Sequence, residues 1–140
     1  MKTLNVTLVH GENDFQIYKD LRDRKKSLHD KGFEVKEYFG SKSLSAKQIK
    51  ESIESASLFG DVTVTILREV NDGKSFFPFL EEIVDYLKSA KSLPNELFIY
   101  SSGKVLKTSK IYKVINAKGK VIEFENPKEV ETLSNINKSI

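Results

Sequence analysis

The sequence contains no cysteine and no tryptophan, and it has only two histidines and three prolines. Without cysteine there can be no disulfide, no thiolate nucleophile and no cysteine-based metal site, which fits a cytoplasmic protein. The two histidines, His10 and His29, do not have the spacing of metal ligands, and we interpret them as a sheet-edge residue and a solvated residue. No apolar run approaches the roughly 18 residues that a membrane helix needs, so we expect no membrane partner.

The composition is that of one globular domain. The chain has 140 residues, of which 39% are hydrophobic and 31% are charged, so residues 1–140 are long enough to form a single domain with its own core. The net charge of +3 permits a local basic patch, but it is too small for an overall nucleic-acid-binding balance. The last expected helix has no stop signal, and we expect the chain to be part of a longer protein.

Apolar alternation predicts strands, and apolar spacing of three and four predicts helices. Strands are expected near residues 3–10, 33–39, 62–67, 97–100 and 121–124. A helix follows each strand, so the order is β-α repeated five times. Strict alternation predicts an α/β fold of three layers, in which a mainly parallel five-stranded sheet carries helices on both faces.

The expected helices have recognisable starts and inner stripes. Asn13 or Asp14 caps the first, Ser45 and Gln48 form a capping box for the second, Pro78 lies near the start of the third, and Pro127 opens the last. The predicted inward residues are Phe15, Tyr18, Leu21 and Leu28; then Ile49, Ile53 and Ala56; then Phe76, Phe79, Leu80, Ile83, Val84 and Leu87; then Ile111, Val114 and Ile115 between about Ser109 and Ala117; and finally Val130, Leu133 and Ile136.

The loop after the first strand is unsuited to nucleotides. In a three-layer α/β fold the ligand lies at the carboxyl ends of the strands, and here the first such loop runs from His10 to Phe15. It has one glycine, no lysine and two acids, Glu12 and Asp14, which would repel a polyphosphate. There is no GxGxxG and no GxSxG motif either. We therefore expect no cofactor, no catalytic residues, no metal site and no enzymatic activity.

Two surface features remain as candidate binding sites. The first is the pair Leu58 and Phe59, between the second helix and the third strand, which either points outward as an apolar anchor for a partner or tucks under the sheet edge. The second is a set of four lysines at a spacing of three, which forms either a DNA-facing patch or a solvated helix face. These lysines are Lys104, Lys107, Lys110 and Lys113.

The chain resembles a known family, the N-terminal domain of the delta subunit of bacterial DNA polymerase III. The resemblance runs from residue 4 to about residue 133 and rests on the order and spacing of several short motifs. These are Gly11-Glu12-Asn13-Asp14-Phe15 after a strand, Ser57-Leu58-Phe59-Gly60-Asp61 before the strand Val62 to Leu67, Phe79-Leu80 with Tyr86-Leu87, the strand Leu97 to Tyr100, and Lys110-Ile111-Tyr112-Lys113 before Val121-Ile122-Glu123-Phe124.

The resemblance implies an AAA+/P-loop-like core that lacks a functional phosphate loop. It further implies a clamp-loader domain that binds the sliding clamp, the beta subunit of the polymerase, and helps to open it during DNA replication. Leu58 and Phe59 would enter a hydrophobic pocket on the clamp, with Ala56 and Ser57 at the margin. Other clamp-loader subunits would be contacted through domains that have no counterpart here, and DNA would be bound weakly if at all.

Two other functions remain open from the residues alone. The chain could be a stand-alone flavodoxin-like or nucleotide-binding protein, in which case ATP or FMN would raise its melting temperature. It could also be a basic nucleic-acid-binding module built on the four lysines, in which case its affinity would fall steeply with salt.

Overall fold

The computed structural model describes residues 4–55, 62–72 and 75–126. Five strands and four helices alternate within these ranges: β1 (Val6–His10), α1 (Asp14–Asp30), β2 (Glu34–Phe39), α2 (Ala46–Glu54), β3 (Thr63–Arg68), α3 (Phe79–Ser89), β4 (Glu96–Tyr100), α4 (Lys110–Lys118) and β5 (Lys120–Glu123). None of these described helices has the length and apolar character to cross a membrane. The helix predicted from Pro127, with Val130, Leu133 and Ile136, falls outside the described residues.

The strands form one sheet in the order β2-β3-β4-β1-β5, and every neighbouring pair is parallel. Leu8 of β1 stands beside Ile99 on one side and Val121 on the other. The predicted five-stranded parallel sheet is therefore confirmed. The prediction that His10 lies at a sheet edge is wrong, because β1 is an interior strand and His10 is only 1% exposed.

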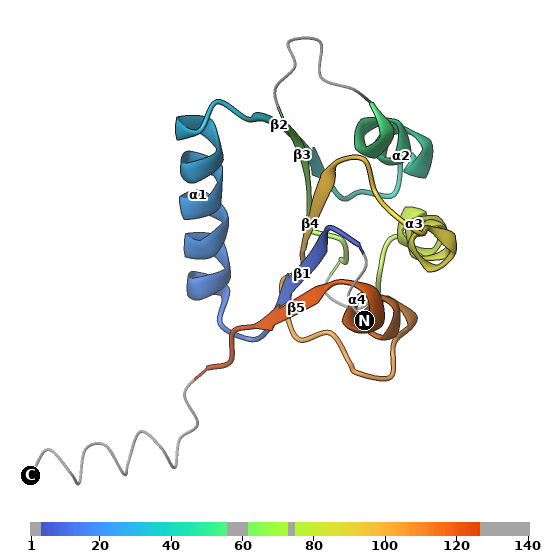
Figure 1. Cartoon of the computed structure of the whole chain (residues 1–140). Coiled ribbons are helices and arrows are strands. Elements are labelled where there is room, and N and C mark those ends of the chain that lie inside the picture. The colour runs from blue at the N-terminus through green and yellow to red at the C-terminus, as the bar shows by residue number, and fades with distance from the viewer. Residues whose placement is uncertain (1–3, 56–61, 73–74, 127–140) are drawn as a thin grey trace, which may run out of the picture.

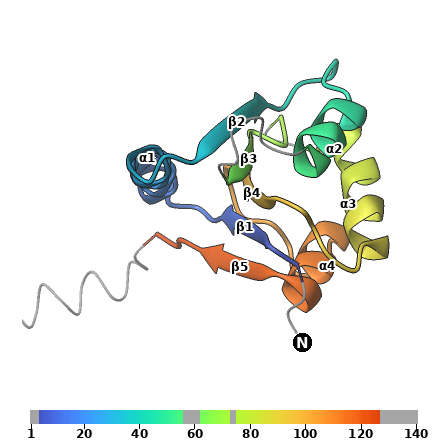
Figure 2. The same ribbon diagram turned by 45° about the horizontal axis from the view of Figure 1, so that its top comes forward.

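The helices lie on both faces because parallel crossovers are right-handed. The connection from β1 to β2 runs toward one edge of the sheet, whereas the connections from β2 through β5 run toward the other. Right-handed crossovers then place α1 alone on one face and α2, α3 and α4 together on the opposite face, as Figures 1 and 2 show.

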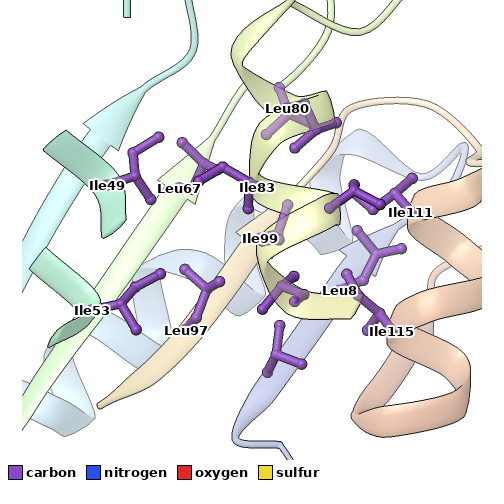
Figure 3. Close-up of a cluster of buried hydrophobic side chains, with 14 of the residues drawn as sticks. Leu8, Ile49, Ile53, Leu67, Leu80, Ile83, Leu97, Ile99, Ile111 and Ile115 are labelled. Atoms are coloured by element: carbon purple, nitrogen blue, oxygen red, sulfur yellow. The ribbon is translucent and has the colours of Figure 1, made fainter. Parts of the chain in front are cut away.

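Each face of the sheet has its own core, since successive strand residues point to opposite sides. Leu8 and Ile99 belong to the larger core beneath α2, α3 and α4, with Ile49, Ile83 and Ile115 from the helices (Figure 3). Val9 points the other way, into the smaller core beneath α1.

The inner stripe of α1 differs from the prediction. Ile17, Leu21 and Leu28 are buried, whereas Phe15 is 74% exposed and Tyr18 is 59% exposed. Ile17, Leu21 and Leu28 follow one another at four and seven residues, which keeps them on one side of a helix. Phe15 precedes Ile17 by two residues, about 200° around the helix, and therefore faces solvent.

Polar groups complete the contact between α1 and the sheet. Glu37 of β2 accepts hydrogen bonds from Lys25 Nζ at 2.9 Å and from Arg68 Nη1 at 2.8 Å. Burial alone would raise the pKa of Glu37, but the hydrogen bonds from Arg68 and Lys25 outweigh it and hold the pKa below its ordinary value. The Tyr100 hydroxyl donates to Asp20 Oδ2 at 2.7 Å on the same face.

The third helix starts later than predicted. Phe79, Leu80, Ile83, Val84 and Leu87 are buried as expected, but α3 begins at Phe79 and Phe76 is 37% exposed. Pro78 disfavours helical backbone in the residue before it, so the helix cannot extend back to Phe76. Phe76 instead forms an antiparallel bridge with Asn71, so its assignment to the helical core was wrong.

Candidate functional site

The fold itself indicates where a ligand would be sought. In an open parallel sheet that place is the crevice outside the carboxyl ends of two adjacent strands whose connections leave toward opposite faces. Here these strands are β1, which leads to α1, and β4, which leads to α4 on the other face (Figure 1).

This crevice is closed by the chain's own backbone. Gly11 N donates to Gly103 O at 3.1 Å, which ties the loop after β1 to the loop after β4. Ser102 Oγ donates to Asp14 Oδ1 at 3.0 Å across the same junction.

At the start of α1, the chain itself uses some of the backbone donors that a phosphate would need. Asn13 caps the helix by accepting from Gln16 N at 3.1 Å, and its own N–H donates to Phe124 O at 3.0 Å. Anion sites at helix starts depend on free backbone N–H groups. With Asn13 N and Gln16 N engaged, and with the acidic Glu12 and Asp14 exposed beside them, the loop is poorly suited to a phosphate.

His10 fills the space between the two loops. Its Nδ1 accepts from Val105 N at 2.9 Å, and its ring packs edge-on against Tyr112 with centroids 6.0 Å apart. An accepting Nδ1 carries no proton, so the ring is neutral. Burial lowers the pKa of His10, the negative charge of Glu123 partly offsets this, and Lys104 lowers the pKa further. The residue therefore has a structural role in holding the 101–109 loop.

We predict that His10 makes folding sensitive to mild acid. Its pKa is lower in the folded chain than the ordinary 6.5, so below that pH the unfolded chain takes up a proton that the folded chain refuses. The contribution is present in full above pH 6.5 and is lost as the pH falls toward the folded-state pKa, with a limiting slope of about 1.4 kcal/mol per pH unit.

Denaturant unfolding of the wild type and of His10→Asn between pH 8 and 5 measures this slope. Asparagine keeps an acceptor near the position of Nδ1 but does not titrate, so the variant should show the shallower pH dependence. The other ionisable groups are common to both chains, so the difference between the two slopes reports on the His10 ring. Equal slopes would assign the acid sensitivity to other groups.

The second region is the passage from α2 to β3, at the edge of the sheet where the strands begin. The Asn95 side chain donates from Nδ2 to Ile53 O at 2.7 Å and to Ser55 O at 2.6 Å, which satisfies carbonyls at the end of α2. Lys36 Nζ donates to Ser55 Oγ at 3.2 Å. On the far side, Val62 O accepts from Glu34 N at 2.8 Å. The chain is thus held at Ser55 and again at Val62.

The predicted clamp-binding residues fall between these two points. Ala56, Ser57, Leu58 and Phe59 lie outside the described residues, so whether the pair points outward remains a prediction. The sequence did not identify Asn95 as an anchoring residue. No local pattern reveals it, because its partners lie about 40 residues earlier in the chain.

We predict that Asn95→Ala destabilises the domain by about 1–3 kcal/mol, because it leaves part-buried carbonyls without a donor. Asn95→Asp should cost more, since a carboxylate would face the same carbonyl oxygens. Chemical unfolding measures both changes, with the exposed Ser92→Ala as the control on the same loop. Equal stability of all three variants would remove Asn95 from its anchoring role.

The four lysines are all exposed but do not lie on one helix. Ser109 caps α4 by accepting from Tyr112 N, so only Lys110 and Lys113 are helical, whereas Lys104 and Lys107 lie in the preceding loop. Lys104 Nζ approaches Glu123 Oε2 at 3.7 Å. The expected single helical stripe is therefore reduced to two lysines on the helix and two beside it.

In the parts of the chain that the structure describes, no group of three or more His, Cys, Asp or Glu side chains is arranged to hold an ion. His29 is exposed near the end of α1, far in sequence from His10. Hydrogen bonds therefore close the crevice between β1 and β4, and they anchor the chain on either side of the α2–β3 passage.

Comparison with known proteins shows what this fold is similar to. No family model matches the chain. Among solved structures, the chain is similar to the Bacillus subtilis DNA clamp loader delta protein (YqeN), with a TM-score of 0.64 and 15% sequence identity. The match covers 96% of this chain and 43% of that one, so the chain spans less than half the length of the delta protein. The three-layer parallel α/β fold is therefore shared with part of a DNA clamp loader delta protein.

Proposed function

We propose that this chain is the clamp-binding domain of a clamp-loader subunit. In this proposal Leu58 and Phe59 insert into a hydrophobic pocket of the sliding clamp, with Ala56 and Ser57 at the margin of the contact. The likeness in fold to a clamp loader delta protein supports the general role. The observation that supports the site is the anchoring of the chain at Ser55 and at Val62, the described residues on either side of the segment to which the sequence assigns the Leu-Phe pair.

The proposed action is mechanical. The domain would bind the clamp better in an opened than in a closed state, and this difference in affinity shifts the clamp toward opening. Nucleotide hydrolysis would belong to other subunits, which a longer form of the chain would contact through further domains. The closure of the β1–β4 crevice favours this division over a nucleotide-binding or flavodoxin-like function.

Binding of the isolated chain to its cognate sliding clamp tests the proposal. Surface plasmon resonance with immobilised clamp should give saturable binding, whereas titration with ATP and Mg²⁺ or with FMN should give no heat. Saturable ATP binding together with silence toward the clamp would favour the nucleotide-binding alternative.

A weak contact with DNA is a secondary part of the proposal. Lys107, Lys110 and Lys113 are exposed and make no ion pair with the described residues, whereas Lys104 lies beside Glu123. Three or four phosphate contacts give a modest affinity that falls with salt. We therefore assign DNA a supporting role and the clamp the main one.

A further inference from the structure

A groove runs between α3 and α4 on the outer side of the three-helix layer. It consists of two neighbouring hollows of about 280 and 340 Å³, and Val84 of α3 and Lys110 of α4 line both of them. Its apolar lining comes from Phe76, Phe77, Leu80, Val84, Val114 and Ala117. The α2–β3 passage is not part of this lining, so the groove is a separate surface.

At one end of the groove, two aromatic side chains are accessible to a partner and are held in place by the backbone. Phe76 is 37% exposed, and Phe77 is only partly buried. The backbone holds both in place, because Phe77 N donates to Val70 O at 2.9 Å and Phe76 bridges to Asn71. Aromatic side chains on a fixed backbone lose little freedom when a partner covers them, which favours binding.

The opposite end is closed by a contact between the two helices. Lys118 Nζ, from the end of α4, donates to Leu87 O and to Ala90 O at 3.0 Å each, at the end of α3. This lysine is therefore occupied in holding the helices together.

The two walls differ in charge along most of the groove: the α4 wall is basic, whereas the α3 wall is acidic over its first turns and has Lys88 beyond them. Lys110 and Lys113 stand one turn apart on α4, and Glu81 and Asp85 stand one turn apart on α3. All four are exposed, and none forms an ion pair with another described residue. A matching ligand needs an apolar stripe that covers the floor of the groove. On one side of the stripe it needs acidic residues, which would face Lys110 and Lys113. On the other side it needs basic residues, which would face Glu81 and Asp85.

We propose that this groove docks an amphipathic helix of a partner protein. A helix with apolar residues at every third or fourth position provides such a stripe, and its two flanks supply the two charges. Single-stranded nucleic acid fits poorly, because Glu81 and Asp85 would repel its phosphates along one wall. The proposal does not depend on clamp binding, since it uses none of residues 56–61.

Three designed peptides test the groove. All three are helical peptides with the same stripe of leucines. The mixed peptide has glutamates on one flank of the stripe and lysines on the other. The second peptide has glutamates on both flanks, and the third has lysines on both flanks. Reversing a helix exchanges its flanks, so peptide direction does not affect the comparison. Fluorescence anisotropy should show the mixed peptide binding the wild-type chain at least about fivefold more tightly than the other two.

Charge reversal on either wall should change this preference. Lys110→Glu with Lys113→Glu should favour the peptide with two basic flanks, and Glu81→Lys with Asp85→Lys should favour the peptide with two acidic flanks. Phe76→Ala should weaken all three interactions, while circular dichroism confirms that each variant remains folded.

Three results would overturn the proposal. The first is no binding of any peptide up to about 1 mM. The second is binding without a change of preference in the reversed variants, or amide shifts that map away from α3 and α4. The third is self-association of the chain that Lys110→Glu with Lys113→Glu abolishes, because the occupant would then be a second copy.

Discussion

Replacing Leu58 and Phe59 by alanine together is expected to weaken clamp binding at least a hundredfold. Burial of a leucine and a phenylalanine in a pocket is worth roughly 1.5–3 kcal/mol each, so their joint loss removes on the order of 3–6 kcal/mol of binding free energy. Surface plasmon resonance on immobilised clamp measures the change. The melting temperature should stay within a few degrees of the wild type, because side chains that serve a partner contribute little to the core.

The matched control removes two aromatic side chains from another surface. Phe15 and Tyr18 of α1 are 74% and 59% exposed, so Phe15→Ala with Tyr18→Ala tests whether any loss of exposed apolar area weakens binding. We expect this control to bind the clamp like the wild type. If the Leu58 and Phe59 variant unfolds instead, the pair belongs to the core. If it stays folded and binds unchanged, the contact surface lies elsewhere.

Gly11→Ala is expected to destabilise the domain by at least about 3 kcal/mol, the largest effect on stability that we predict. Gly11 has a φ of +134°, and an added Cβ would lie 2.1 Å from Phe124 O. The backbone strain alone costs about 1–3 kcal/mol. The clash would also push Phe124 away from its hydrogen bonds with His10 O and Asn13 N, each worth about 0.5–1.5 kcal/mol.

Gly103→Ala is the matched control, because Gly103 faces Gly11 across the same junction. Its φ is +88°, but no atom lies within 4 Å of an added Cβ. Only the left-handed backbone is penalised, at about 1–2 kcal/mol. Urea unfolding compares the two variants. Equal losses would mean that the close approach of Gly11 to Phe124 does not hold β5 in place.

The sequence predicted the layered fold because strand and helix periodicities alternate cleanly along the chain. The strand order could not be predicted from the sequence, because the pairing of β1 with β4 and β5 depends on contacts between distant segments. The same limit explains His10. Pairing with β5 makes β1 an interior strand, and the contacts of the His10 ring come from Val105 and Tyr112, about 100 residues later in the chain. Periodicity was also misleading near helix starts, as at Phe15 in the first turn of α1 and at Phe76 just before α3.

The candidate site was predictable only in part. The absence of a phosphate-loop motif from the first loop could be read from the sequence, as could the acidic Glu12 and Asp14. The closure of that crevice by Gly11 and Gly103 could not, because it needs two loops that are about 90 residues apart. Asn95 and the α3–α4 groove likewise exist only once the chain is folded.

Hydrogen–deuterium exchange of the chain with and without the sliding clamp tests the central proposal most directly. We expect the clamp to slow exchange in peptides that cover residues 56–61, and to leave the β1–β4 crevice and the α3–α4 groove unchanged. Clamp binding that protects another surface while residues 56–61 exchange at their free rate would contradict the proposed site. The absence of any protection at saturating clamp would contradict the proposed function.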